Sequence, residues 1–464
     1  MEYLATSGAL DAALDELAKS LPPGVLLRQP DRLDKYKWDR ALDPNAATPL
    51  AAVRAERTEH MQTALRWASK HRVPVVPHRA GSGLSGGATG LADGIVVSTE
   101  RMRDIPSVDP ATRIAVVQPG LLNAEVKRAV AEVGLWYPPD PSSYEFCSIG
   151  GNVATNAGAL CCVKYGMTTD YVLGLEVVLA DGRAVRLGGP RLKDVAGLSL
   201  TRLFVGSEGT LGVITEITLR LMPPQQPAHT LVAWFADTHD ATGAILDITS
   251  KIRPSMLEYM DRVAINAVED DLHMGLDREA AALVVAQSDN QNPAAGEVEV
   301  MLEACRRNNA ADVLDTSDQD EGEMFVAVRR AAIPAVEKRG RQLLEDVGVP
   351  LLRLPEWVAG VGRIGVDSDV MIAVIAHADD GNTHPLIVFD PADAAMERRA
   401  NFAFGEIMDL AIGLGATITG EHGVGRLKRP WLENQVGPDV LDISRAVKGA
   451  LDPLDILNPG SILA

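Results

Sequence analysis

The sequence predicts an α+β protein with more than one domain, and three observations support this prediction. Its 464 residues exceed what a single hydrophobic core usually holds. In the N-terminal half, short β-rich runs alternate with amphipathic helical segments and glycine-rich loops. Beyond Pro223, Pro224 and Pro227 the composition becomes helical and acidic, which indicates a second domain after a linker.

Two helices are predicted in the N-terminal half from apolar residues at helical spacing. The first covers Thr58–Lys70, with Thr58 as its cap, and the second covers Asn123–Val133, with Asn123 as its cap and Gly134 at its end. Short apolar runs predict strands at residues 73–76, 95–98 and 113–118.

A β-hairpin is predicted from two apolar runs, Val172–Leu179 and Arg183–Leu187, joined by an Asp-Gly pair typical of a type I′ turn. A further β-rich run covers Gly212–Met222. Between these regions and the second helix, residues 137–166 are crowded with proline, glycine and asparagine. We predict a long ordered loop there, and such loops are more often functional than incidental.

The second domain is predicted to contain helices at residues 261–271 and 297–309, followed by a strand near Met371 that leads into His377. A helix is predicted at about Arg399–Gly413, then a loop over Thr417–Arg426, then an amphipathic helix over Asp442–Leu451 that ends before a proline.

Composition excludes several classes of function. The net charge of −19 disfavours nucleic acid and simple adsorption to an anionic membrane as partners, because both need a basic surface. No apolar run is long enough for a membrane span, and the N-terminal residues lack the pattern of a secretory signal, so we expect a cytoplasmic protein. The four cysteines, with Cys161 and Cys162 adjacent, predict buried free thiols.

A glycine-rich loop follows the strand at residues 73–76. Residues 81–86 fit GxGxxG, the pattern of a nicotinamide-binding turn, but that turn must open directly into a helix. Only Gly87–Gly94 separates this motif from the next strand, so no helix fits. If the loop binds phosphate, it does so through its own backbone N–H groups, and a tight surface loop is the alternative.

Two more glycine motifs, Ser148–Gly158 and Gly206–Gly212, lie in the same half of the chain. Three such loops suit a large dinucleotide that lies across the fold. Near the C-terminus, His377 and His384 stand seven residues apart around a glycine turn, and Glu421-His422 adds a carboxylate and an imidazole. This set suits a catalytic divalent ion, although the spacing is loose and histidines of the surface or core are an alternative.

These motifs resemble those of a known family. Residues 77–88 (PHRAGSGLSGGA), 137–158 (YPPDPSSYEFCSIGGNVATNAG), 164–166 (KYG) and 206–216 (GSEGTLGVITE) are similar to the FAD-binding domain of the vanillyl-alcohol oxidase and p-cresol methylhydroxylase (PCMH) superfamily. Within it the chain most resembles the FAD-linked 2-hydroxy-acid dehydrogenases, which include the glycolate oxidase catalytic subunit, D-lactate dehydrogenases and D-2-hydroxyglutarate dehydrogenase.

The resemblance implies a two-subdomain PCMH-type FAD-binding domain over residues 1–224. An α+β cap domain with an antiparallel sheet follows over 225–405, and a C-terminal helical segment over 406–464 completes the active site. It also implies a set of cofactor-binding residues: Arg79, Ala80, Gly81, Ser82, Gly83, Leu84, Ser85, Pro139, Asp140, Gly150, Gly151, Asn152, Asn156, Gly158, Ile214 and Asn458. His78-Arg79 departs from the family's usual Arg-Gly. Residues 81–87 contain no His or Cys, so the FAD is expected to be noncovalent.

The resemblance also assigns the metal and catalytic residues. His377, His384 and Glu421 would ligate zinc or a similar divalent ion, and His422 would be the free base. Ala376 and Asp379 depart from the family's Gly-His-x-Gly-Asp-Gly-Asn form of the first loop.

The implied reaction is metal-assisted oxidation of a D-2-hydroxy acid, in which the metal lowers the pKa of the hydroxyl, His422 takes its proton and the hydride passes to flavin N5. Arg329 would clamp the substrate carboxylate, with Asn382 facing the substrate.

Substrate and partners follow from the same resemblance. D-2-hydroxyglutarate enzymes place a lysine and a threonine where this chain has Leu344 and Ile333, which favours D-lactate, glycolate or a longer apolar 2-hydroxy acid. The expected electron acceptor is a protein or a quinone, and the expected assembly is a homodimer. The alternatives are a D-2-hydroxyglutarate dehydrogenase, a nicotinamide-dependent dehydrogenase and a noncatalytic flavin-binding subunit of a larger oxidase complex.

Overall fold

The structure, a computed structural model, describes residues 7–158, 160–292 and 296–463. Within them the chain forms two compact units. The first contains the described residues up to Ala157, then Met167–Pro224, then the residues from His422 onward. The second contains the described residues of Gly158–Gly166 and Gln225–Glu421. The chain therefore leaves the first unit at Pro224, near the prolines that predict a linker, and re-enters it between Glu421 and His422.

The first unit contains a four-stranded sheet in the order β1-β2-β4-β3, in which β2, β4 and β3 are parallel and β1 is antiparallel to β2. Its strands are β1 (Leu26–Leu27), β2 (Ala51–Arg54), β3 (Val75–His78) and β4 (Ile95–Ser98). The helices α1 (Ser7–Ser20) and α3 (Thr58–His71) pack in the same hydrophobic core as these strands. Short helical turns, α2 (Pro30–Leu33) and η1 (Asp34–Tyr36), precede β2.

A five-stranded antiparallel sheet of order β5-β6-β9-β7-β8 completes the two-subdomain arrangement of the first unit. Its strands are β5 (Ser107–Asp109), β6 (Ile114–Val117), β7 (Val172–Val178), β8 (Ala184–Gly188) and β9 (Val213–Arg220). Its helices are α4 (Asn123–Ala131), α5 (Ile149–Thr155), η2 (Thr168–Asp170) and α7 (Leu200–Phe204).

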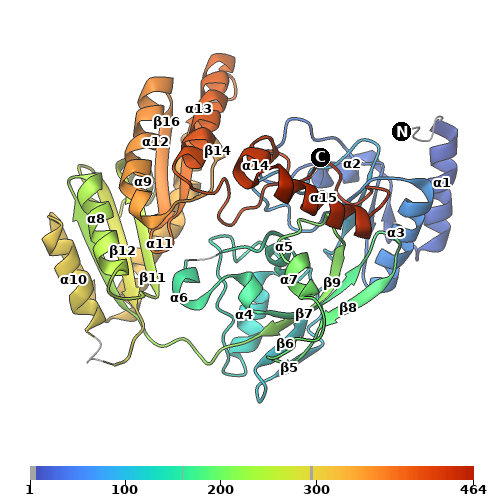
Figure 1. The fold of residues 1–464 in the computed structure, drawn as a ribbon, viewed down its shortest axis with the longest axis horizontal. Helices are drawn as coiled ribbons and strands as arrows, with labels where there is room; N and C mark the ends of the chain where they lie inside the picture. The colour runs from blue at the N-terminus through green and yellow to red at the C-terminus, as the bar shows by residue number, and fades with distance from the viewer. Residues whose placement is uncertain (1–6, 159, 293–295, 464) are drawn as a thin grey trace. The chain divides into compact units, whose positions relative to one another are not determined.

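The C-terminal segment belongs to the first unit. It contains α14 (Arg429–Val436) and α15 (Pro438–Leu451), drawn in red in Figure 1. After α15, Leu457 pairs in parallel with Val75 of β3, and the Asn458 amide donates to the Val75 carbonyl at 2.8 Å. The end of the chain is thereby fixed to the edge of the N-terminal sheet.

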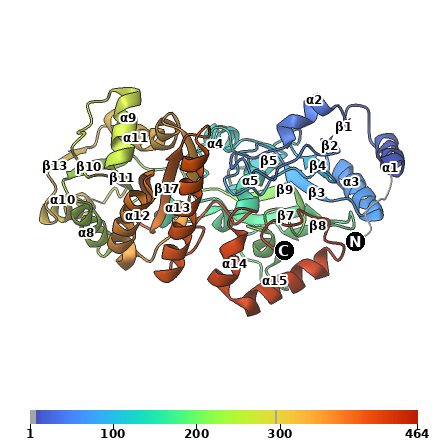
Figure 2. The same cartoon turned by 90° about the horizontal axis from the view of Figure 1, so that it is seen from above.

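The second unit is built on an eight-stranded antiparallel sheet of order β13-β10-β12-β11-β16-β17-β14, with β15 paired to β17. Figure 2 shows α9 and α11 on one face and α8, α10, α12 and α13 on the other. Every residue of β17 is buried, as expected for a strand covered on both faces. The elements are α6 (Cys162–Tyr165), β10 (His229–Phe235), α8 (Thr238–Thr249), β11 (Met256–Asp261), α9 (Arg262–Leu272), β12 (Ala282–Ser288), α10 (Glu297–Arg307), β13 (Asp312–Thr316), α11 (Gln319–Glu337), β14 (Arg341–Leu344), β15 (Val347–Gly348), η4 (Leu351–Arg353), α12 (Leu354–Ser368), β16 (Met371–His377), β17 (Asn382–Phe389) and α13 (Ala394–Gly413).

The structure corrects three local predictions. Thr58 and Asn123 are not N-caps, because each is the first helical residue; the Asn123 side chain instead donates to Pro139 O and Asn152 Oδ1. The predicted β-hairpin is present as β7 and β8, but only Gly182 of the Asp-Gly pair has a positive φ, whereas a type I′ turn needs two. The predicted long loop contains two helices, α5 and α6.

All four cysteines are free and buried, which confirms that prediction. Among the described residues, none of the helices has the length and apolar character that a membrane crossing requires.

Candidate active site

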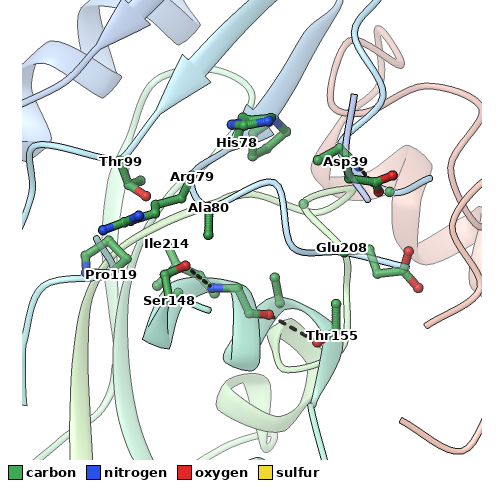
Figure 3. Close-up of a pocket in the computed structure, with 18 of the residues that line it drawn as sticks. Asp39, His78, Arg79, Ala80, Thr99, Pro119, Ser148, Thr155, Glu208 and Ile214 are labelled. Atoms are coloured by element: carbon green, nitrogen blue, oxygen red, sulfur yellow. Dashed lines mark hydrogen bonds between the residues drawn. The ribbon is translucent and has the colours of Figure 1, made fainter. Parts of the chain in front are cut away.

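A cavity lies within the first unit, between the glycine-rich loops (Figure 3). Nine of the predicted cofactor residues line it: Arg79, Ala80, Gly81, Ser82, Gly83, Ser85, Gly150, Gly151 and Ile214. Figure 3 shows Arg79, Thr99 and Pro119 at one end of the cavity and the acids Asp39 and Glu208 at the other. A cavity walled by two glycine-rich segments suits a dinucleotide.

The first glycine loop has the shape that the sequence predicts. No helix occurs between Gly81 and Ile95, where β4 begins. Gly81 and Gly86 have φ values of +64° and +77°, a left-handed conformation that glycine adopts without strain. The loop therefore exposes backbone rather than side chains to the cavity, as a phosphate-binding loop must.

Arg79 places a cation at the cavity wall. Its Nε donates to the carbonyl of Gly120 at 2.9 Å, and burial lowers the pKa of the guanidinium from its usual value. The side chain is half-buried and lies between β3 and Pro119 (Figure 3). At the position where the family usually has glycine, this chain therefore has a fixed positive charge in the cavity.

The second glycine motif is the start of α5 rather than a loop. Ser148 caps this helix by accepting from the Gly151 amide at 3.2 Å (Figure 3). Gly150 is required by packing, because a Cβ there would lie 2.5 Å from Pro119 Cβ, whereas a Cβ on Gly151 would meet only Ser148 Oγ at 3.2 Å. Packing therefore requires a glycine at position 150 more strictly than at position 151.

Other predicted cofactor residues of the first unit do not line the cavity: Leu84, Pro139, Asp140, Asn152, Asn156 and Asn458. Asn152 contacts Asn123 and Cys147, and Asn156 ends α5 in a left-handed conformation with φ of +53°. Asn458 donates from Nδ2 to the carbonyls of Gly87 and Glu208 at 2.7 and 2.8 Å. Gly158 belongs to the second unit, where a Cβ on it would collide with the carboxylate of Glu421.

Two buried acids at the cavity wall, Asp39 and Glu208, are absent from the sequence prediction. Asp39 accepts from the amides of Ala41 and Ala88 at 3.1 and 3.3 Å, and burial raises its pKa to about 6. Burial raises the pKa of Glu208 to about 7. A carboxylate inside the glycine-rich run Gly206–Gly212 was the available signal for Glu208, while Asp39 lies in a stretch without any pattern.

The predicted metal ligands converge within the second unit. The Nε2 atoms of His377 and His384 lie 3.4 and 3.2 Å from the same oxygen, Oε1, of Glu421, and all three side chains are largely buried. Burial lowers the pKa of His377, but the charges of Glu258 and Glu421 outweigh it and hold that pKa well above its usual value. Two imidazole nitrogens around one carboxylate form the donor set that a divalent ion such as zinc prefers, so the residues fit a metal.

Each of the two histidines also has a carboxylate near its Nδ1 atom. Glu258 Oε1 accepts from His377 Nδ1 at 2.7 Å, and Asp346 Oδ1 lies 3.8 Å from His384 Nδ1. The hydrogen bond to Glu258 directs Nε2 of His377 toward a metal, because the proton remains on Nδ1. The ligand atoms of Asp346, His384 and Glu421 also lie within 4.8 Å of one another. Neither Glu258 nor Asp346 is part of the sequence prediction.

Arg329 lies beside this cluster, also in the second unit. Its side chain is 1% exposed, and its Nε forms an ion pair with Glu258 Oε2 at 2.7 Å. Its Nη2 is buried with no hydrogen-bond partner among the described residues. Glu258 therefore joins Arg329 to His377, and a buried guanidinium edge remains available for an anion.

The remaining predicted residues lie on the loops around the cluster. Asn382 begins β17, and its Oδ1 is buried with no hydrogen-bond partner in the described part of the chain. Asp379 is 4% exposed, and burial together with the nearby Asp380 and Glu258 raises its pKa well above the usual value. His422 follows Glu421 in sequence as the first residue of the C-terminal part of the first unit, and its carbonyl accepts from Ser85 Oγ at 3.3 Å.

Comparisons with known proteins agree with this geometry. A family model of FAD-binding domains matches residues 49–188, and the C-terminal domain of FAD-linked oxidases matches residues 224–462. Two solved structures share the fold at 18% sequence identity. p-Cresol methylhydroxylase with substrate bound has a TM-score of 0.81 and covers 98% of this chain and 97% of its own. 4-Ethylphenol oxidase from Gulosibacter chungangensis has a TM-score of 0.80 and covers 99% and 98%. The predicted PCMH-type fold is confirmed.

Curated relatives are more similar in sequence. Glycolate oxidase subunit GlcD of Bacillus subtilis is 38% identical over 432 residues, which is 92% of each chain. GlcD of Escherichia coli K12 is 38% identical over 452 residues, 97% of this chain and 90% of its own. A D-lactate dehydrogenase of Archaeoglobus fulgidus is 32% identical over 461 residues, 97% and 99% of the two chains. With matches of this extent, the chain belongs to the FAD-linked oxidases and is an FAD-binding oxidoreductase.

Proposed function

We propose that this protein oxidises a D-2-hydroxy acid to the 2-oxo acid, using noncovalent FAD and a divalent metal ion. The observation that carries the proposal is the chain of contacts Arg329–Glu258–His377, which joins a buried cation with a free donor edge to the imidazoles of a metal-type cluster. A 2-hydroxy acid has the two groups that such a site would bind, a carboxylate for the guanidinium and a hydroxyl for the metal.

Arg329 is proposed to bind the substrate carboxylate. Guanidinium groups recognise carboxylates through two parallel N–H donors, and the buried Nη2 of Arg329 offers such a donor. Glu258 holds the guanidinium through Nε, which leaves the other edge for the substrate. Asn382 supplies a second polar group, with its buried side-chain amide at the start of β17.

His422 is proposed to take the proton of the substrate hydroxyl. Imidazole titrates near neutral pH and is therefore an effective general base there. The bond between the hydroxyl oxygen and its proton breaks, the carbonyl forms, and the Cα hydrogen leaves with its electron pair. FAD, when bound, accepts that hydride at N5.

The metal ion is proposed to be zinc, held by His377, His384 and Glu421. A divalent ion at such a site supplies Lewis acidity, which lowers the pKa of a bound hydroxyl. Glu258 and Asp346 then act on the ligands themselves, because each lies against the Nδ1 side of one histidine.

The favoured substrate is a monocarboxylate such as D-lactate, glycolate or a longer apolar 2-hydroxy acid. The relatives GlcD and D-lactate dehydrogenase carry names of this class. Ile333 and Leu344, where a second carboxylate would need polar partners, pack instead against the apolar core of the second unit. D-2-hydroxyglutarate is the competing substrate, and a noncatalytic flavin subunit is the competing role.

Further proposals concern the cofactor linkage and the partners. The absence of His and Cys from residues 81–87 supports noncovalent FAD. The printed description of GlcD as a subunit supports a protein partner, and a protein or quinone is proposed as the electron acceptor. A homodimer in the cytoplasm is proposed from the family resemblance.

The test is anaerobic bleaching of the bound flavin by a panel of D- and L-2-hydroxy acids, with and without a chelator. The proposal predicts bleaching by D-lactate or another D-monocarboxylate and loss of that bleaching after metal removal. If D-2-hydroxyglutarate bleached the flavin faster than the D-monocarboxylates, it would replace them as the proposed substrate. No bleaching by any 2-hydroxy acid, in a protein whose flavin is reduced normally by dithionite, would favour the noncatalytic role.

A further inference from the structure

The loop that carries Glu421 and His422 is held by a buried carboxylate on its N-terminal side. Asp346, in the second unit, is fully buried. Its Oδ2 accepts from Thr419 Oγ1 at 2.6 Å and from the amides of Gly420 and Glu421 at 2.9 Å each. Three donors on one carboxylate oxygen fix the backbone that leads into Glu421.

A different buried carboxylate holds the other side of the loop. Glu208 lies in the first unit. Its Oε1 accepts from the Val424 amide at 2.7 Å, and its Oε2 accepts from the Gly425 amide at 2.8 Å. Each oxygen serves one amide, so the whole carboxylate is used. These contacts fix the backbone immediately after His422.

The backbone around Glu208 is built for this contact. Glu208 has a φ of +48°, a left-handed conformation that costs a residue with a side chain about 1 kcal/mol or more and that clusters at functional positions. Its amide donates to the carbonyl of Ala154 near the end of α5, and its own carbonyl accepts from Asn458 Nδ2. Both hydrogen bonds are 2.8 Å long. Gly423 must be glycine, because a Cβ there would lie 2.6 Å from Glu208 Oε1.

We propose that Asp346 and Glu208 are a pair of positioning residues, one in each unit, that fix the two halves of the loop bearing Glu421 and His422. Asp346 sets the backbone of Glu421 within the second unit, and Glu208 sets the backbone after His422 within the first. The chain passes between the units at the Glu421–His422 bond, so each residue of the pair is held by its own unit. The functional consequence rests on the proposed roles of Glu421 and His422.

The chemistry of the contacts explains why Glu208 is an acid. Its two oxygens each accept from one backbone N–H, and a carboxylate accepts at both oxygens. An amide of the same shape has one accepting oxygen, and its NH2 group would face another donor. Substitution of Glu208 by Gln must therefore sacrifice at least one of the two contacts with Val424 and Gly425.

Hydrogen exchange at single-residue resolution tests the anchoring directly, in the flavin-loaded, metal-containing protein without substrate, at about pH 8, above the pKa of Glu208. In Glu208→Gln, we expect the amides of Val424 and Gly425 to exchange about tenfold faster or more, while those of Gly420 and Glu421 keep their protection. In Asp346→Ala, which removes the accepting oxygen, the reverse pattern is expected. The two variants are thus matched controls for each other. Glu216→Gln, which removes a carboxylate of β9 that pairs with exposed Arg186, should change neither half.

The functional readout is the limiting rate of flavin reduction at saturating substrate. Glu208→Gln should lower this rate, measured per bound flavin, about tenfold or more, because His422 is displaced. If Glu208→Gln does not fold, Glu208→Asp, which keeps the charge and shortens the reach, should show the same local exchange pattern.

Wild-type exchange at Val424 and Gly425 in both Glu208 variants would overturn the proposal, as would a uniform loss of protection across the first unit. The exchange pattern requires no turnover. If the pattern appears but no 2-hydroxy acid bleaches the flavin, the proposed reaction is wrong and the anchoring stands.

Discussion

The Nδ1 atom of His377 lies 2.7 Å from a carboxylate oxygen of Glu258, a residue on a neighbouring strand that is completely buried. The other oxygen of Glu258 lies 2.7 Å from Nε of Arg329. One carboxylate therefore sets the orientation of a predicted metal ligand and of the predicted substrate clamp. A disturbance at Glu258 should appear in metal binding and in substrate binding together.

Replacing Glu258 by Gln should weaken metal binding roughly 10- to 100-fold, because the charge that makes His377 a better donor is lost. Competition with a fluorescent chelator measures the affinity without reference to turnover. Asp289→Asn is a suitable control, since Asp289 is a buried acid of the same unit that pairs with Lys164 and Tyr165. Equal metal affinity in wild type and Glu258→Gln would remove Glu258 from the site.

Replacing Arg329 by Lys should reduce kcat/KM roughly 100-fold. Lysine can keep the ion pair with Glu258, but it lacks the planar second edge that the carboxylate needs. The decisive comparison is between a 2-hydroxy acid and its methyl ester or amide. The wild type should prefer the acid strongly and the variant weakly, and an unchanged preference would show that the carboxylate binds elsewhere.

The two glycines at the start of α5 should respond differently to alanine. Gly150→Ala should lower thermal stability and FAD content together, because its Cβ would lie 2.5 Å from Pro119 Cβ and 2.9 Å from Pro119 O. Gly151→Ala should leave the fold intact, since alanine favours helix by about 1 kcal/mol and its Cβ would need only a small shift of Ser148 Oγ, 3.2 Å away. Any loss of FAD in Gly151→Ala then reports the cavity wall itself. Equal stability of the two variants, measured by calorimetry, would contradict the packing argument.

The stability of the first unit should depend on pH through Glu208. Its pKa is about 7 in the folded protein, above the usual 4.5, so the folded state retains a proton that the unfolded chain loses. Stability from this group is complete below pH 4.5 and is lost as pH rises toward 7. Relative to wild type, Glu208→Gln should gain roughly 2–3 kcal/mol between pH 4.5 and pH 8, on the order of 5 °C in Tm. A pH-independent difference in Tm would show that Glu208 is ionised throughout.

Sequence patterns predict the long elements well because their signals are local. The helix predicted at about Arg399–Gly413 is part of α13, Ala394–Gly413, and the predicted strand at residues 95–98 coincides with β4. By contrast, the sequence does not predict α5, because Gly150 and Gly151 lower the intrinsic helix propensity of that segment. A cap from Ser148 and close packing against Pro119 support it instead.

In the candidate site, too, the residues that stand in local sequence motifs are predicted and the others are not. The first glycine loop and the two metal-loop histidines stand in recognisable motifs. Glu258 does not, because its partner His377 lies 119 residues away and no periodicity links them. Asp39 and Asp346 have no sequence signal either, since a buried acid is identified by what surrounds it in space, and Glu208 has only its place in a glycine-rich run. The anchors of the site are therefore what only the structure reveals.

The pairing of Leu457 with Val75 has a consequence for how the protein is made. Synthesis on the ribosome proceeds from the N-terminus, so the cavity cannot gain its Asn458 contact until residue 458 has emerged. The second unit, apart from Gly158–Gly166, is one continuous stretch and can fold while the first still lacks its last segment. Nascent chains are therefore expected to acquire flavin only after residue 458 has left the ribosome. A stop codon before residue 458 should yield a protein with a folded second unit and an open, cofactor-poor first unit.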